Sequence, residues 1–181
     1  MSIQTESIAT TYKGIRMRSR LEAKWASMFD TFDWQWEYEP PGYSGWIPDF
    51  QIRTNSVPLL VEVKPAASIS DACAQEAMED IRRCLNGVHC NALILGIGPM
   101  YGPRNDESCL GWMPESGGDA CWWDFAAVGE IDGGKICLCH SSGSYMCRIC
   151  GDYNGNCANM EASLLRHCWA KACNQFQWKP K

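Results

Sequence analysis

Apolar side chains recur every three or four positions in three segments of the chain, which is the spacing of one face of an α-helix. The first segment spans residues 16–32, the second begins after Ser70, a residue type that caps helices, and ends near Gly87, and the third spans residues 160–175. Polar residues occupy the positions between these apolar ones. The pattern therefore predicts three amphipathic helices.

Shorter segments have the pattern of β-strands. Residues 34–39 alternate aromatic and polar positions, and two runs at 49–52 and 59–64 are joined by a turn at 54–56. Residues 92–97 form a near-continuous apolar run, typical of a strand buried on both faces. The strand at 59–64, the second helix and this run predict a βαβ unit with a right-handed crossover, so the two strands should be parallel. We expect the strand at 34–39 to lie antiparallel to the one at 49–52.

These elements predict an α/β fold with a small mixed β-sheet flanked by helices. Residues 98–118 are rich in Gly, Pro, Asn and Ser, with a short strand suggested only around Trp112 and Met113, and residues 119–128 fit a strand or a helix equally. We therefore divide the chain into a core at 1–100, a loop-rich metal-binding insertion at 101–158, and a C-terminal helix at 159–181 that packs on the core.

Composition favours one folded domain with a hydrophobic core. The chain has 181 residues, of which 46% are apolar and nine are tryptophan. No apolar run reaches the roughly 18 residues that span a bilayer, and residues 1–6 lack the pattern of a secretory signal. We expect no membrane association and a cytoplasmic location, the host cytoplasm if the chain is phage-encoded. The twelve cysteines are then expected to be free thiols and metal ligands instead of disulfides.

Two charged residues occupy a strand that is otherwise apolar. Glu62 and Lys64 share one face of the run at 59–64 with Leu60, and a buried charge is costly unless it has a partner. Asp49 begins the neighbouring strand, so its carboxylate can come close to that of Glu62. Two adjacent carboxylates repel each other, and a divalent cation would relieve the repulsion.

The motif Pro48-Asp49, followed after thirteen residues by Glu62-Val63-Lys64, resembles the PD-(D/E)xK nuclease superfamily. Upstream, the segment Arg18-Ser-Arg-Leu-Glu-Ala-Lys-Trp25 on the first helix and Trp36-Glu-Tyr-Glu39 after it are similar to the layout of phage Holliday-junction resolving endonucleases and of transposon end-cleaving nuclease subunits. The resemblance covers about residues 12–97.

The resemblance implies a restriction-endonuclease-like fold and a catalytic set of Glu22, Asp49, Glu62 and Lys64. It further implies that Asp49, Glu62 and the backbone carbonyl of Val63 bind Mg²⁺ or Mn²⁺. For Glu22 the alternative is a surface carboxylate paired with Arg18.

The net charge of −5 argues mildly against a protein that coats nucleic acid, but five cations gather around the start of the first helix. We interpret them as phosphate contacts, and the alternative is a solvated helix face. They are Lys13, Arg16, Arg18, Arg20 and Lys24.

A cysteine-rich segment predicts a structural zinc site independently of the resemblance. Cys147-x-x-Cys150-Gly is a zinc-knuckle half, because a two-residue spacer lets both thiolates reach one tetrahedral ion. Cys137-x-x-His140 has the same spacer, so we expect Cys137, His140, Cys147 and Cys150 as ligands, with Cys139 as the alternate. The alternative is a set of buried, unliganded thiols.

The sequence thus predicts a magnesium-dependent DNA endonuclease with structural zinc, acting on junctions or other branched DNA. Two alternatives stay open: a non-catalytic binding or inhibitor protein that keeps the nuclease fold, and a nuclease subunit of a recombination or transposition complex. Both a homodimer and a larger complex are compatible with the sequence. No base-reading module is visible, so junctions, flaps, nicked duplexes and single strands all stay open as substrates.

Overall fold

The structure is a computed structural model that describes residues 7–85, 90–102, 107–114, 123–131, 134–141, 146–151 and 158–177. Within these ranges the helices are α1 (Arg20–Thr31), α2 (Ala72–Leu85) and α3 (Ala162–Gln175). None of them is long and apolar enough to cross a membrane.

The described residues form one eight-stranded mixed sheet and a separate hairpin of β1 (Thr10–Tyr12) and β2 (Ile15–Met17). The sheet order is β10-β8-β7-β6-β5-β4-β3, and β9 pairs with β8. The strands of the sheet are β3 (Trp36–Tyr38), β4 (Phe50–Ile52), β5 (Leu59–Val63), β6 (Asn91–Tyr101), β7 (Ser108–Pro114), β8 (Trp123–Ile131), β9 (Lys135–His140) and β10 (Ala158–Asn159).

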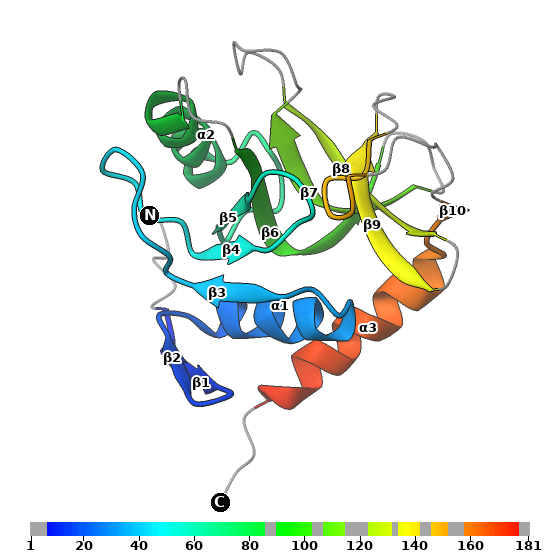
Figure 1. The fold of residues 1–181 in the computed structure, drawn as a ribbon. Helices are drawn as coiled ribbons and strands as arrows, with labels where there is room; N and C mark the ends of the chain where they lie inside the picture. Colours follow the sequence, from blue (N-terminus) through cyan, green and yellow to red (C-terminus); the bar gives the residue numbers. More distant parts are fainter. Residues whose placement is uncertain are drawn as a thin grey trace, which may run out of the picture.

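Helices cover both faces of the sheet (Figure 1): α1 and α3 lie side by side on one face and α2 lies on the other. Alternation along β5 explains the division, because successive side chains point to opposite faces. Val61 joins the core beneath α1, where Phe29 and Phe50 pack edge to face with ring centroids 5.3 Å apart. Leu60 points the other way and packs with Ile81 of α2.

The expected strand pairings are confirmed. Strand β4 is antiparallel to both β3 and β5, and β5 is parallel to β6 across the α2 crossover. The first helix starts later than the apolar pattern suggested, because residues 15–17 form β2 and Ser19 caps α1. Helix α2 begins at Ala72 directly after Asp71, whose carboxylate accepts hydrogen bonds from two preceding backbone amides.

The expectation of a small sheet with a loop-rich insertion is wrong. Strands β7, β8 and β9 extend the sheet beyond β6, and the ambiguous segment is a strand over residues 123–131. Gly111 lies at the β6–β7 contact, where an added Cβ would stand 2.0 Å from the Ile94 carbonyl oxygen. Its presence in the run Cys109-Leu-Gly-Trp-Met interrupts the strand signal in the sequence while allowing the close approach of the two backbones.

Candidate functional site

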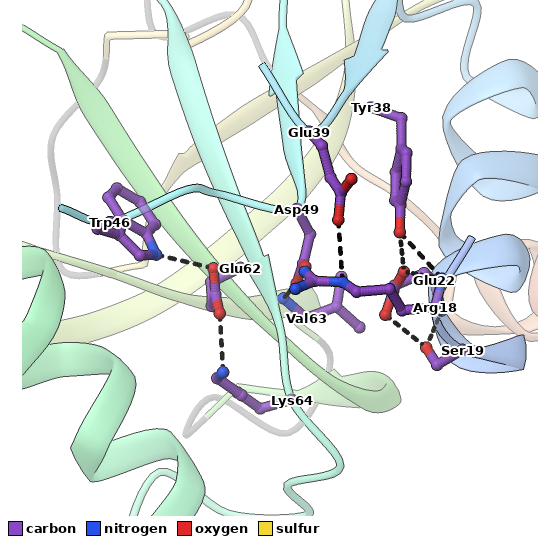
Figure 2. A network of polar contacts seen from close by, with 10 residues as sticks. All are labelled: Arg18, Ser19, Glu22, Tyr38, Glu39, Trp46, Asp49, Glu62, Val63 and Lys64. Atoms are coloured by element: carbon purple, nitrogen blue, oxygen red, sulfur yellow. Dashed lines mark hydrogen bonds and ion pairs between the residues drawn. The ribbon is translucent and has the colours of Figure 1, made fainter. Parts of the chain in front are cut away.

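Asp49 and Glu62 lie near each other beside β4 and β5, with the Glu62 carboxylate turned to Trp46 and Lys64 and the Asp49 carboxylate turned to Arg18 (Figure 2). The antiparallel ladder ends at the pair of Phe50 and Val61; Asp49 directly precedes β4, and Glu62 follows Val61 on β5. Asp49 is 2% exposed and Glu62 is 7% exposed. Two buried carboxylates thus lie at the end of the β4–β5 ladder, close enough for the charge of Glu62 to raise the pKa of Asp49.

Each oxygen of Asp49 has a different partner. The Val63 backbone N–H donates to Oδ2 at 2.7 Å, and the Arg18 guanidinium contacts Oδ1. Burial and the charge of Glu62 nevertheless raise the pKa of Asp49 from 3.8 to about 7, against the opposing effects of the Val63 amide and Arg18. Asp49 is therefore only partly ionised at neutral pH, and added positive charge beside it would favour its carboxylate form.

Glu62 is held from both sides. Trp46 Nε1–H donates to Oε2 at 2.9 Å, and Lys64 Nζ lies 2.7 Å from Oε1. Burial alone would lower the pKa of Lys64, but the charges of Glu62 and Asp49 outweigh it and raise that pKa. Lys64 is consequently a protonated ammonium, about one third exposed, beside the carboxylate pair.

Lys64 is fixed to the sheet through its backbone. Its N–H donates to the Leu95 carbonyl at 2.9 Å, and further along the same strand pair Ile97 N–H donates to the Ala66 carbonyl at 2.9 Å. At Gly96 a Cβ would lie 2.4 Å from the Ala66 oxygen, so only glycine allows this close pairing. The pairing of β5 with β6 therefore continues past the strand and positions Lys64 at the site.

Glu22 forms a capping box at the start of α1. Ser19 Oγ accepts the Glu22 N–H at 3.1 Å and donates to Glu22 Oε1 at 2.8 Å, while Tyr38 OH donates to Oε2 at 2.7 Å. Glu22 lies close enough to Asp49 for its charge to add to the raised pKa there. However, Glu22, Asp49 and Glu62 do not bring three carboxylate oxygens within 4.8 Å of one another.

The five expected phosphate contacts are distributed over two regions. Lys13 forms an ion pair of 2.9 Å with Asp30. Asp30 lies eight residues after Glu22, which is about 12 Å further along α1. Arg16 is exposed on β2, and Arg18 reaches the carboxylate site. Of the remaining two, Arg20 and Lys24 are half-buried on α1. Arg18 is thus the cation of this set that contacts Asp49.

All four carboxylate oxygens of Asp49 and Glu62 have a partner within the chain. Two buried carboxylates and the neighbouring backbone carbonyl of Val63 offer the hard oxygen ligands that Mg²⁺ and Mn²⁺ prefer. The unfavourable ionisation of Asp49 is the feature that a bound cation would reverse.

A second candidate metal site lies where β9 meets the turn at residues 147–150. The sulfur atoms of Cys137, Cys139 and Cys147 lie within 4.8 Å of one another, so this group could hold a metal ion. Backbone N–H groups of Ile149 and Cys150 both donate to Cys147 Sγ at 3.4 Å, which is the amide arrangement expected of a zinc knuckle. Hydrogen bonds from Cys137 and Cys139 lower the pKa of Cys147, favouring its thiolate.

Cys139, expected as the alternate ligand, belongs to this group, whereas His140 and Cys150 lie outside it. The reason for His140 is strand geometry: residues 135–140 form β9, so residue 140 points to the face opposite Cys137 and Cys139. His140 is buried, and desolvation together with the charge of Arg148 lowers its pKa to about 4. Its Nδ1 has no hydrogen-bond partner among the described residues.

Two contributors to the site were not foreseen. The spacing Ser19-x-x-Glu22 is a capping-box signature that was readable in the sequence. Trp46 had a weaker signal, since Ser44 and Gly45 adopt positive φ in a tight turn that brings Trp46 back to pair with Tyr43. That turn directs the indole N–H to Glu62.

Comparison with known proteins gives no relative: no family model, no curated protein and no solved structure matches this chain. We therefore infer function from the geometry of the two sites.

Proposed function

We propose that this protein is a divalent-metal-dependent endonuclease that hydrolyses phosphodiester bonds in DNA. The observation that supports the proposal is the two buried carboxylates, Asp49 and Glu62, with the Lys64 ammonium 2.7 Å from Glu62. Two buried carboxylates close to each other destabilise a fold, and a bound cation would offset that cost. Cation binding therefore gives a physical reason for their presence. The similarity to PD-(D/E)xK nucleases extends the proposal to a restriction-endonuclease-like core and to junction or branched DNA.

Asp49, Glu62 and the Val63 carbonyl would hold Mg²⁺ or Mn²⁺, which supplies a Lewis acid for the phosphoryl oxygen and lowers the pKa of a bound water. Lys64 carries a positive charge, which suits it to orient the attacking water and to stabilise charge developing on the phosphate. Trp46 holds Glu62 in one orientation through Oε2. Glu22 shapes the same region as the cap of α1 and would reach a second cation through water.

A supercoiled-plasmid nicking assay with Mg²⁺ or Mn²⁺ tests this function. Asp49→Asn, Glu62→Gln and Lys64→Ala should each reduce the cleavage rate by at least about a hundredfold, because each removes charge that acts in the transition state. Glu37→Gln is the matched control, since Glu37 is an exposed carboxylate on β3. Cleavage at the parental rate in the Asp49 or Lys64 variant would refute the assignment.

We also propose that the cysteine group is a structural zinc site, with Cys137, Cys139 and Cys147 as ligands and Cys150 as the fourth. The mutual approach of three sulfurs, the amides directed at Cys147 Sγ and the lowered pKa of Cys147 support it, because zinc binds thiolates. A structural zinc ion contributes roughly 10 kcal/mol of apparent binding energy at neutral pH.

Elemental analysis tests the zinc proposal and its ligand set. Protein purified without chelator should carry about one zinc per chain, and Cys147→Ser or Cys139→Ser should lose it. His140→Ala should retain it. Loss of zinc in the His140 variant with retention in the Cys139 variant would restore the Cys137, His140, Cys147 and Cys150 set instead.

A further inference from the structure

Arg18 covers the proposed metal-binding carboxylate from the solvent side. Its guanidinium contacts Asp49 Oδ1, and its Nε lies 3.1 Å from Glu39 Oε1 (Figure 2). The Arg18 side chain is 57% exposed and that of Asp49 is 3% exposed. Since Val63 N–H already occupies Asp49 Oδ2, a ligand that approaches Asp49 from solvent meets the guanidinium first.

The backbone and the side chain of Arg18 are held by different kinds of contact. Arg18 N–H donates to Glu22 Oε2 at 3.1 Å and to Tyr38 OH at 3.0 Å, so the capping box of α1 anchors the residue beside the site. The guanidinium, by contrast, is held by ion pairs to Asp49 and to the exposed carboxylate of Glu39. The Arg18 side chain is 57% exposed, so it can turn to solvent when a divalent cation supplies positive charge to Asp49 in its place.

We propose that Arg18 competes with the catalytic cation for Asp49 and that, once displaced, it binds a phosphate of the DNA. A guanidinium and a divalent cation cannot share Asp49 Oδ1 without repulsion between like charges. A planar guanidinium forms paired hydrogen bonds to phosphate, and the fixed backbone keeps it within side-chain reach of the cation site. This inference rests on the proposed nuclease function and adds a second position for Arg18.

The competition predicts opposite effects of Arg18→Gln in two measurements. Without DNA, the variant should bind Mn²⁺ about three to ten times more tightly, because the competing charge is absent; each tenfold corresponds to about 1.4 kcal/mol. In plasmid nicking, the Mn²⁺ concentration for half-maximal rate should fall, while the maximal rate should fall about tenfold or more because the phosphate contact is lost. Arg18→Lys should give values between those of the parent and Arg18→Gln in both measurements, because lysine keeps the positive charge but lacks the planar fork of donors.

The experiment titrates Mn²⁺ by electron paramagnetic resonance in the absence of DNA, with a parallel nicking series over the same metal concentrations. Arg82→Gln is the matched control, because it removes an exposed cation on α2 that belongs to neither proposed site. Asp49→Asn identifies which Mn²⁺ site is measured. Thermal unfolding of each variant verifies that it is folded.

The outcomes separate this inference from the function beneath it. Tighter Mn²⁺ binding with a lower maximal rate in the Arg18→Gln variant alone supports the competition. An Asp49-dependent Mn²⁺ site that Arg18→Gln leaves unchanged, or that Arg82→Gln strengthens equally, overturns the competition and leaves the nuclease proposal standing. Absence of any Asp49-dependent Mn²⁺ site in the parent overturns both.

Discussion

Asp49 should reduce the stability of the protein at neutral pH when no divalent cation is present, so Asp49→Asn should be stabilising. Burial and the charge of Glu62 raise the pKa of Asp49 from 3.8 to about 7. Asparagine has nearly the shape of a protonated aspartate and carries no charge at any pH. The variant therefore avoids the cost of ionising a buried carboxylate.

The sign of the pH dependence follows from proton linkage. Between pH 4 and 7 the folded protein holds the Asp49 proton and the unfolded chain does not, so stability falls as the pH rises through this window. The rise from 3.8 to about 7 corresponds to about 4 kcal/mol, at about 1.4 kcal/mol per pH unit. About 2 to 3 kcal/mol of that cost develops between pH 5 and pH 8.

Urea unfolding at pH 5 and pH 8, in buffer freed of Mg²⁺ and Mn²⁺, measures the effect. The unfolding free energy of the Asp49→Asn variant minus that of the parent should grow by about 2 to 3 kcal/mol from the lower to the higher pH. Glu37→Gln, at an exposed carboxylate, should show no such growth. A difference that is equal at both pH values, or a variant less stable than the parent at pH 8, would refute the reasoning.

Two further substitutions test individual contacts. Trp46→Phe removes the indole N–H that donates to Glu62 Oε2, so the nicking rate should fall about tenfold. Trp123→Phe should not change the rate, because the Nε1 of Trp123 has no hydrogen-bond partner among the described residues. Equal nicking rates in both variants would contradict a positioning role for Trp46. Gly111→Ala places a Cβ 2.0 Å from the Ile94 carbonyl oxygen, so the unfolding free energy should fall by about 3 kcal/mol; an unchanged urea midpoint would show that β6 and β7 can separate without cost.

The sequence was most informative where one physical pattern dominated. Alternation along residues 59–63 and the turn before it were sufficient to predict the β4–β5 pairing, and with it the approach of Asp49 to Glu62. The same reasoning failed from residue 98 onward. There, glycine at position 111 and proline at position 114 interrupt the strand pattern, and only the pairing with β6 reveals β7.

Ligand spacing was a weaker guide than backbone conformation at the cysteine site. Cys137-x-x-His140 has the spacing of a knuckle, but a two-residue spacer brings two side chains together only in a turn. Residues 135–140 are a strand, in which positions two apart share a face, so Cys139 joins Cys137. Cys147-x-x-Cys150 lies in a turn, and there the expected amide bonds to sulfur are present.

The packing of α3 against α1 has a consequence during protein synthesis. Trp25 and Trp169 lie with ring centroids 4.6 Å apart, and Ser27 donates a hydrogen bond to Gln175 at 2.9 Å, although about 140 residues separate the two helices in the chain. At roughly 5–20 residues per second, a ribosome adds this length in about 7 to 28 seconds. Throughout that interval the part of α1 that packs on α3 lacks its final cover, so this apolar surface is exposed in the nascent chain until the last helix emerges.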